Sequence, residues 1–478
     1  HQPASIPSVP RALWVNPGPA GGPSFALAVQ AVLSAPPYRD DTVTRILLAG
    51  SLLAIALPAH AVDVDFSGYY RARARAYQSL SIDTDADESE GLAAYVQHRV
   101  LLRPTIYVND NIEMSADIRG LDGIAWGDEP VEFMGVPLAE SIVEFDSLEP
   151  PDGGASNIQL WRAWAEVHAG NHTVRFGRMP LNWGSGIWWN DGLGYNADYG
   201  DTADRLQYEG LFGEIYVSGA IDVVTEGLLS RNDDMTAFNA MAAYRSETIT
   251  AGVAAQVRHR PDPNLTVLTL DAAFDAEIGR IEVHGEGVAR FGTGDLTEDL
   301  TDINIASGGA VLDGSVGFDW ATVGLQAGLA TGDDDTDTTL STFRFDRDYN
   351  VGIVMFEQPL PTVNTGGVRD TSNSLSGNSV SNALFLKPRI SRVFAERLEV
   401  EGSLLWARAL VVPTGTANEG RRSYGFEFDA TARYIGLEHL DLGLTGAVFL
   451  PGSWYSELDG SDLSQPVFGA QLLGRVVF

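Results

Sequence analysis

The last twelve residues of the chain, VFGAQLLGRVVF, show a side-chain pattern with a period of two. Counting back in steps of two gives only apolar or small residues: Phe478, Val476, Gly474, Leu472, Ala470 and Phe468. The interleaved positions include the polar residues Gln471 and Arg475. Because successive side chains of a β-strand point to opposite faces, this pattern predicts a strand with one apolar and one polar face.

The same alternation recurs from Val62 to the end of the chain. In the segment 66–77, small and apolar residues alternate with a second set: Tyr69, Arg71, Arg73, Arg75 and Tyr77. The alternating segments are joined by connections that are short and long in turn. Two of the short ones, Asn109–Asn111 and Ala169–Asn171, are rich in residues that favour tight turns. A soluble β-sandwich would not separate its long and short connections so regularly.

We therefore predict an all-β chain that folds as a transmembrane antiparallel up-and-down β-barrel. The pattern indicates about 18 strands, with 16 as the alternative, joined by long extracellular loops and short periplasmic turns. The last strand, which ends on Phe478, resembles the closing strand of bacterial outer-membrane barrels. This resemblance implies an integral outer-membrane location and recognition of that strand by the barrel-assembly machinery.

Composition agrees with a barrel and excludes several other classes of protein. The 478 residues have a mean hydropathy of −0.04, which is compatible with a membrane barrel because its apolar residues alternate with polar ones. The absence of cysteine excludes a disulfide framework. A net charge of −33 disfavours a nucleic-acid partner, because phosphates would be repelled. We expect the lipid bilayer and lipopolysaccharide to be the partners of the outer surface.

The N-terminal part predicts export across the inner membrane. Arg45 precedes an apolar core at 46–57, and Ala59 and Ala61 form an A-x-A site. These three features are typical of a secretory signal peptide. We expect residues 43–61 to be this signal, with cleavage after Ala61, and residues 62–478 to form the barrel. Residues 1–42 show no periodic pattern, and we interpret them as a non-native or untranslated upstream segment.

Arginines dominate the face that is predicted to line the lumen. The nine pore-lining candidates are Arg71, Arg73, Arg75, Arg99, Arg103, Arg119, Arg162, Arg175 and Arg205. Guanidinium groups remain charged and match the geometry of carboxylates, so a wall of them would favour anions. The alternative is that these arginines pair with acids on the same face, such as Glu166, Glu286 and Glu427. Both arrangements remain open at this point.

The long connection at 179–204 is a candidate constriction or sugar-contact loop. Its aromatic and amide residues include Trp183, Trp188, Trp189, Asn190 and Tyr195. Such side chains stack on sugars and bind them by hydrogen bonds, and Gly184, Gly186, Gly192 and Gly194 would let the segment fold tightly into the lumen. The alternative is an aromatic girdle at the membrane interface.

Residues 160–192, LWRAWAEVHAGNHTVRFGRMPLNWGSGIWWNDG, resemble the alginate-export family of outer-membrane porins. The resemblance places Arg162, Arg178 and Trp183 at the motif positions, and it implies an 18-stranded barrel with an arginine-lined pore. We therefore expect passive passage of a hydrophilic, anionic solute such as an acidic sugar or polysaccharide. The sequence departs from the family in having one lysine, Lys387, and in its long 331–380 connection.

Catalytic motifs are missing from the sequence. It contains no G-x-S-x-G, P-loop or H-E-x-x-H motif, and its histidines lie at no spacing typical of metal ligands. We expect no enzymatic activity, no cofactor and no metal. One alternative is a structural or adhesive barrel plugged by residues 124–157 or 331–380. A less favoured one is an outer-membrane hydrolase that uses His168 or His284.

Overall fold

The computed structural model describes residues 62–82, 91–125, 131–133, 136–139, 158–226, 233–296, 301–334, 337–358, 360, 379–412, 420–458, 461–462 and 464–478. The regular secondary structure of these residues is β-strand. Within them, no helix is long and apolar enough to cross a membrane. The chain separates into two units, His1–Asp63 and Val64–Phe478. The predicted upstream segment and signal peptide lie outside the described residues, as does most of the proposed 124–157 plug.

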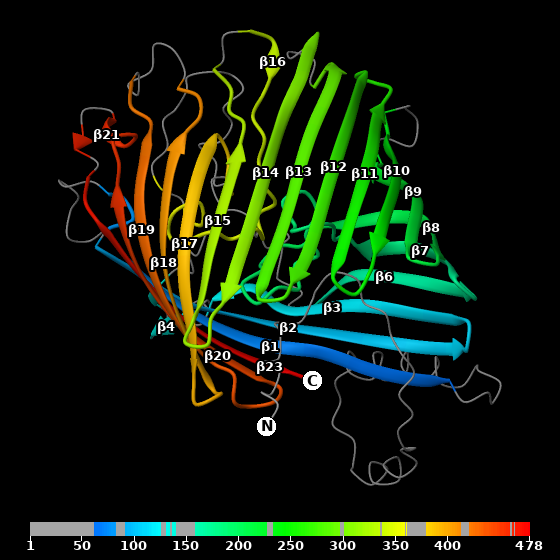
Figure 1. Cartoon of the computed structure of the whole chain (residues 1–478), viewed down its shortest axis with the longest axis horizontal. Coiled ribbons are helices and arrows are strands. Elements are labelled where there is room, and N and C mark those ends of the chain that lie inside the picture. The colour runs from blue at the N-terminus through cyan, green and yellow to red at the C-terminus, as the bar shows by residue number, and fades with distance from the viewer. Residues whose placement is uncertain are drawn as a thin grey trace. The chain divides into compact units, whose positions relative to one another are not determined.

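The main sheet has 19 strands, and all of them except the two-residue β16 (Thr339–Leu340) form a closed antiparallel ring of 18 (Figure 1). The ring strands are β1 (Asp63–Gln78), β2 (Leu92–Asn109), β3 (Ile112–Ala125), β6 (Ile158–Ala169), β7 (His172–Pro180), β8 (Thr202–Phe212), β9 (Ile215–Thr225), β10 (Met235–Arg245), β11 (Ile249–Arg260), β12 (Leu265–Ile278), β13 (Ile281–Gly294), β14 (Ile303–Gly317), β15 (Thr322–Ala330), β17 (Ala383–Phe394), β18 (Leu398–Ala409), β19 (Ser423–Tyr434), β20 (Leu440–Pro451) and β23 (Val467–Val477).

Each ring strand pairs with its neighbours along the chain, and β23 closes the ring on β1, with Arg73 opposite Leu473. The predicted 18-stranded up-and-down barrel is therefore confirmed, and the alternative of 16 strands is wrong. Two small hairpins pair outside the main sheet: β4 (Val131–Phe133) with β5 (Val136–Ala139), and β21 (Ser456–Leu458) with β22 (Ser461–Asp462).

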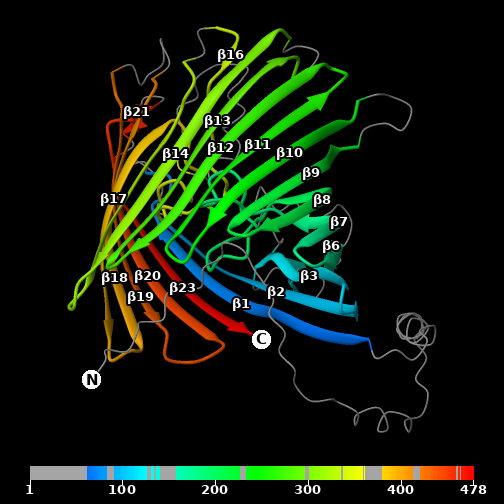
Figure 2. The same cartoon turned by 45° about the vertical axis from the view of Figure 1, so that its right-hand side comes forward.

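Short turns join the strands at one end of the barrel (Figure 2). β2 ends at Asn109 and β3 begins at Ile112, while β6 ends at Ala169 and β7 begins at His172. Both turns lie where the sequence predicts them. Gly170 adopts a φ of 62°, a left-handed conformation that glycine reaches without a Cβ clash. The long connections therefore all start from the opposite end.

The two faces of the wall differ in polarity. On β1, Arg73 and Tyr77 point inward and are each 1% exposed. Outward-facing residues are large and apolar, such as Leu206 on β8 and Leu472 on β23, which are 54% and 56% exposed. A closed ring satisfies the backbone groups of every strand internally, so this apolar outer surface suits a bilayer.

Whether the outer surface faces lipid can be tested by placing an arginine at two different depths along the wall. Leu472 lies at the middle of β23, and Leu437, which is 53% exposed, lies in the turn between β19 and β20. We expect Leu472→Arg to lower the free energy of unfolding in lipid vesicles by about 2–4 kcal/mol, and Leu437→Arg by less than about 1 kcal/mol. Denaturant titration of both variants measures the difference, and equal losses would contradict a membrane-facing wall.

Candidate functional site

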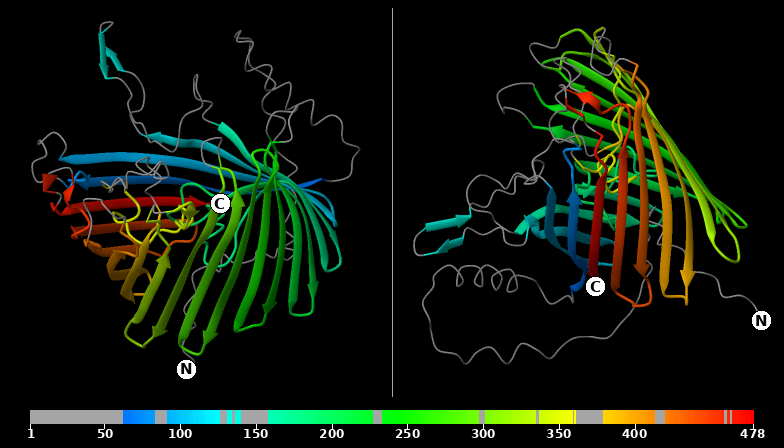
Figure 3. Two further views of the ribbon diagram at one scale, coloured as in Figure 1. Left: turned by 90° about the horizontal axis from the view of Figure 1, so that it is seen from above. Right: turned by 90° about the vertical axis from the view of Figure 1, so that its left-hand side faces the viewer.

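Two connections pack against the inner face of the wall, and we call them the first inner loop (residues 181–201) and the second inner loop (residues 341–358). The first joins β7 to β8, and the second lies between β16 and β17. Trp183 and Val354, one from each loop, are 2% and 0% exposed. Figure 3 shows the strands of the sheet in two further views. The lumen is thus occupied by ordered protein.

The first inner loop folds back on itself through paired glycines. Gly192 and Gly200 both have left-handed φ angles, 71° and 89°. A Cβ atom on Gly192 would lie 2.5 Å from the Cα of Gly200, so a larger residue does not fit there. The Asp201 amide donates to the carbonyl of Asn190 at 2.6 Å and closes the loop.

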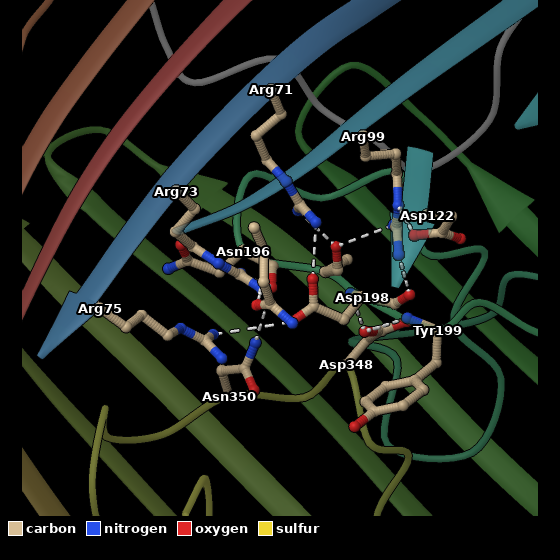
Figure 4. Close-up of polar contacts among 12 residues, drawn as sticks. Arg71, Arg73, Arg75, Arg99, Asp122, Asn196, Asp198, Tyr199, Asp348 and Asn350 are labelled. Carbon is tan, nitrogen blue, oxygen red and sulfur yellow. Dashed lines mark hydrogen bonds and ion pairs between the residues drawn. The ribbon is translucent and has the colours of Figure 1, made fainter. Parts of the chain in front are cut away.

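An acidic residue of this loop, Asp198, is held by three arginines of β1 (Figure 4). Arg71 Nη2 lies 2.6 Å from its carboxylate, Arg75 Nη2 lies 3.6 Å away, and Arg73 Nη2 also donates to it. Burial alone would raise the pKa of the Asp198 carboxyl, but the guanidinium groups outweigh burial and hold this pKa well below its ordinary value. Asp198 therefore occupies these arginines as a resident anion.

Other arginines hold the backbone of the first inner loop. Arg119 Nη2 donates to the carbonyl of Tyr199 at 2.7 Å, and Arg162 Nη2 donates to the carbonyl of Asp201 at 2.7 Å. The ring of Trp161 lies beside both guanidinium groups, 3.0 Å from Arg119 Cζ and 3.4 Å from Arg162 Cζ. Carbonyl oxygens and an aromatic face thus surround these two guanidinium groups.

The remaining predicted arginines bind acidic side chains of the wall. The ion pairs are Arg99–Asp122 (2.5 Å), Arg103–Asp117 (2.5 Å), Arg175–Glu166 (2.9 Å) and Arg205–Asp222 (2.6 Å). The structure thus places all nine arginines on the inner face and engages each of them with a protein group. The motif residue Arg178 is different: it points outward and pairs with Asp204 at 2.6 Å, with 55% of its side chain exposed.

The aromatic residues of the first inner loop are mostly buried. Trp183 Nε1 donates to Asp271 on β12 at 2.6 Å, which makes Trp183 an anchor of the loop. Trp188 and Trp189 stack with their ring centroids 4.0 Å apart. Burial raises the pKa of the Tyr195 hydroxyl to about 12. These positions lie within the lumen and not in an outer girdle.

Carboxyl groups on the strands of the wall accept hydrogen bonds from backbone amides of both inner loops. Glu286 on β13 accepts the Ser185 amide at 2.6 Å, and Glu427 on β19 accepts the Met355 amide at 2.6 Å. The two loops also bind each other, since Asp348 accepts the backbone amide of Asp198 at 2.6 Å.

A cavity of about 320 Å³ remains between the two inner loops and the wall. It is lined by Leu181, Trp188, Trp189, Asp201, Thr202, Arg258, Arg290, Arg344, Phe345, Asp346, Arg347 and Ser379. Arg258 comes from β11, Arg290 from β13 and Arg347 from the second inner loop. Among the described residues, none of these three forms an ion pair within 4.0 Å. This cavity is the candidate site for an anionic solute.

Two carboxyls of the cavity, Asp201 and Asp346, are hydrogen-bonded to each other. Burial raises the pKa of both, and the negative field of Asp201 adds to the rise for Asp346. A shared proton is the simplest way for two adjacent buried carboxyls to coexist. The pair therefore carries about one negative charge at neutral pH, and the cavity stays cationic.

Sequence reasoning missed both the resident anion and the arginines of the cavity. Asp198 lies in a connection without periodicity, so no pattern indicated its target. Arg258 and Arg290 do fall at inward positions of alternating strands, which is a usable signal. What the sequence could not show is which arginines have an acid within reach, because that depends on how the inner loops fold.

Known proteins resemble this chain in structure and not in sequence. No family model and no curated protein sequence matches it. The solved structure of OccK9 (OpdG) from Pseudomonas aeruginosa is similar, with a TM-score of 0.51 at 11% identity, over 87% of this chain and 99% of that one. OccK8 (OprE) from P. aeruginosa (TM-score 0.50, 10% identity) and a BenF-like porin from Pseudomonas fluorescens Pf-5 (TM-score 0.50, 12% identity) each match 87% of this chain and 98% of theirs. At this identity the likeness shows the fold, which is that of outer-membrane porins.

The ion cluster on Asp198 can be tested against an exposed pair. Asp198→Asn leaves Arg71 and Arg73 buried without their anion, and we expect the free energy of unfolding to fall by about 3–5 kcal/mol. Asp204→Asn breaks only the exposed pair with Arg178, so its cost should stay below about 1 kcal/mol. Denaturant titration of both variants gives the comparison, and similar losses would show that Asp198 does not hold the first inner loop.

The raised pKa of Asp346 makes stability depend on pH. The folded protein keeps a proton that the unfolded chain releases above about pH 4, so this stabilisation is lost as pH rises toward the folded pKa. We expect wild type to lose stability relative to Asp346→Asn, which donates a hydrogen bond to Asp201 at every pH, by about 1.4 kcal/mol per pH unit within that window. Parallel profiles in denaturant titrations from about pH 4 to about pH 8 would contradict the shared proton.

Proposed function

We propose that this protein is an outer-membrane channel for the passive passage of hydrophilic, anionic solutes. The cavity between the inner loops carries the proposal, because Arg258, Arg290 and Arg347 present three guanidinium groups without an ion-pair partner among the described residues. A guanidinium offers several donors in a plane that matches a carboxylate. An anion that enters the lumen would find these donors there and not on the occupied arginines of β1.

The charges around this cavity suit the passage of a solute better than its tight binding. Permeation needs contacts that are favourable but weak, so that the solute can also leave. Arg258 donates from Nε to Gln256 at 2.7 Å, which orients it while its Nη groups remain available. The adjacent Asp201–Asp346 pair adds a negative field that weakens the hold on an anion. The balance of these charges favours brief binding.

We extend the proposal to acidic sugars as the solute class. Trp188 and Trp189 line the same cavity and offer ring faces on which a sugar can stack. The resemblance of residues 160–192 to alginate-export porins points to the same class. A cavity of about 320 Å³ suits one or two sugar units at a time, so an acidic polysaccharide would have to pass as an extended strand.

The proposed setting follows from the surface of the barrel. The apolar outer face would contact lipid and lipopolysaccharide after export across the inner membrane, and the β23 strand would be the part that the barrel-assembly machinery binds. We propose no nucleic-acid partner and no catalytic activity. The two histidines considered for hydrolysis have other partners: His168 contacts Thr173 Oγ1 and His284 contacts Asp275.

A plugged structural barrel is the second candidate, and a specific observation favours it. Both inner loops are fastened to the wall by buried ion pairs and amide–carboxylate bonds, for example through Asp198 and Glu427. A lumen filled in this way would conduct poorly. Single-channel measurement separates the two candidates directly.

The deciding experiment is current through a planar bilayer under a salt gradient. We expect wild type to favour anions, and the double variant Arg258→Gln/Arg290→Gln to lower the anion-to-cation permeability ratio by roughly fivefold, equivalent to about 1 kcal/mol. Arg178→Gln removes an arginine from the outer face and should leave the ratio unchanged. Cation selectivity of the wild type would contradict the anion channel, and the absence of current would support the plugged barrel.

A further inference from the structure

A second cluster of polar residues lies far along the wall from the cavity, at the end with the short turns. Glu113 is the second residue of β3, and Glu166 and His168 lie near the end of β6. Glu113 stands directly opposite Glu166 in the ladder, and His168 follows Glu166 by two residues on the same inward face. The sequence separates Glu113 from the other two by more than fifty positions, so no motif spacing could reveal the cluster.

The three side chains converge on one point. His168 Nε2 lies 3.8 Å from Glu113 Oε1 and 3.9 Å from Glu166 Oε2. One donor atom from each residue lies within 4.8 Å of the other two. A metal ion about 2.0–2.2 Å from nitrogen and oxygen ligands separates those ligands by up to about 4 Å. The cluster therefore needs only small side-chain rotations to enclose an ion.

Two residues outside the cluster orient it. Thr173 Oγ1 lies 3.1 Å from His168 Nδ1, which directs Nε2 toward the carboxylates. Trp164 Nε1 donates to Glu166 Oε1 at 2.8 Å, while Oε2 lies 3.9 Å from His168 Nε2 and 2.9 Å from Arg175 Nε, so an ion would share Oε2 with Arg175 or displace it. Metal-binding histidines and carboxylates are commonly held in this way through the atom that does not bind the metal.

The charges of the cluster are not balanced by the neighbouring side chains. Like charges that stand directly opposite each other in a ladder are destabilising. Arg175 binds Glu166 at 2.9 Å and Glu209 at 2.9 Å, so it is shared by two carboxylates. Among the described residues, His168 is the one basic group within 4.0 Å of Glu113. A cation between Glu113 and Glu166 would remove this repulsion.

We propose that Glu113, Glu166 and His168 bind a divalent transition-metal ion of the zinc type. An imidazole with two carboxylates suits zinc and its neighbours, whereas calcium and magnesium prefer oxygen ligands alone. Three protein ligands leave a coordination position for water, since His168 is one-third exposed. The bound ion joins β3 to β6 and adds positive charge at this mouth of the lumen.

The test uses the full chain in detergent, with Zn²⁺ followed by calorimetry and Co²⁺ by its visible absorption. We expect one Zn²⁺ per chain, a Co²⁺ spectrum with a nitrogen ligand, and at least roughly tenfold weaker binding in Glu113→Gln and in His168→Gln. His284→Gln is the matched control, because His284 also faces the lumen near a short turn but, among the described residues, has one carboxylate within 4.0 Å, that of Asp275 at 2.9 Å. It should bind Zn²⁺ as wild type does.

Folding is checked separately, so that loss of binding cannot come from loss of the barrel. Glu113→Gln removes a carboxylate that has no guanidinium within 4.0 Å among the described residues, and we expect its heat-modifiable migration to match wild type. Saturable Zn²⁺ binding that is lost in both variants while the barrel persists supports the site. No saturable binding, or equal binding by wild type and both variants, overturns it. Neither result depends on whether the channel conducts anions.

Discussion

Closure of the ring by β1 and β23 is the constraint on which the rest of the structure depends. The ladder runs from Tyr69 opposite Val477 to Gln78 opposite Phe468. Beyond it, Phe478 and Gly68 exchange two backbone hydrogen bonds of 2.9 and 3.0 Å. In an apolar surrounding, an open edge would leave a row of amides and carbonyls without partners, each at a cost of several kcal/mol. Closure thus fixes the register, and the register decides which side chains face the lumen.

That register creates an electrostatic problem inside the barrel. Arg71, Arg73 and Arg75 alternate with small residues on one strand, so three guanidinium groups point inward side by side. Buried charges of one sign are tolerated only when opposite charge and hydrogen bonds meet them. Asp198 meets this need from a segment more than a hundred residues away. The first inner loop is therefore a structural part of the wall as well as an occupant of the lumen.

The opposite side of the lumen carries paired carboxyl groups. Glu427 accepts amides of the second inner loop and lies beside Asp429, to which it is hydrogen-bonded. Glu286 and Asp271 form a similar pair beneath the first inner loop. The two sides of the lumen therefore bind the inner loops differently. On one side, arginines bind Asp198 and backbone carbonyls of the first inner loop. On the other side, carboxyl groups accept hydrogen bonds from backbone amides of both inner loops. Arg258, Arg290 and Arg347 of the cavity lie outside both arrangements and form no ion pair within 4.0 Å among the described residues.

The sequence by itself determined the secondary structure and the fold, because a side-chain period of two and the turn residues are local properties of the chain. From Arg73 and Leu472 alone, one could assign the inner and outer faces of β1 and β23. The tertiary structure decided which charges are free. Whether Arg71 meets Asp198, or whether His168 meets Glu113, depends on loops and strands that are distant in sequence. Pairing of buried charges is set by distances of a few ångströms, and no periodicity encodes those distances.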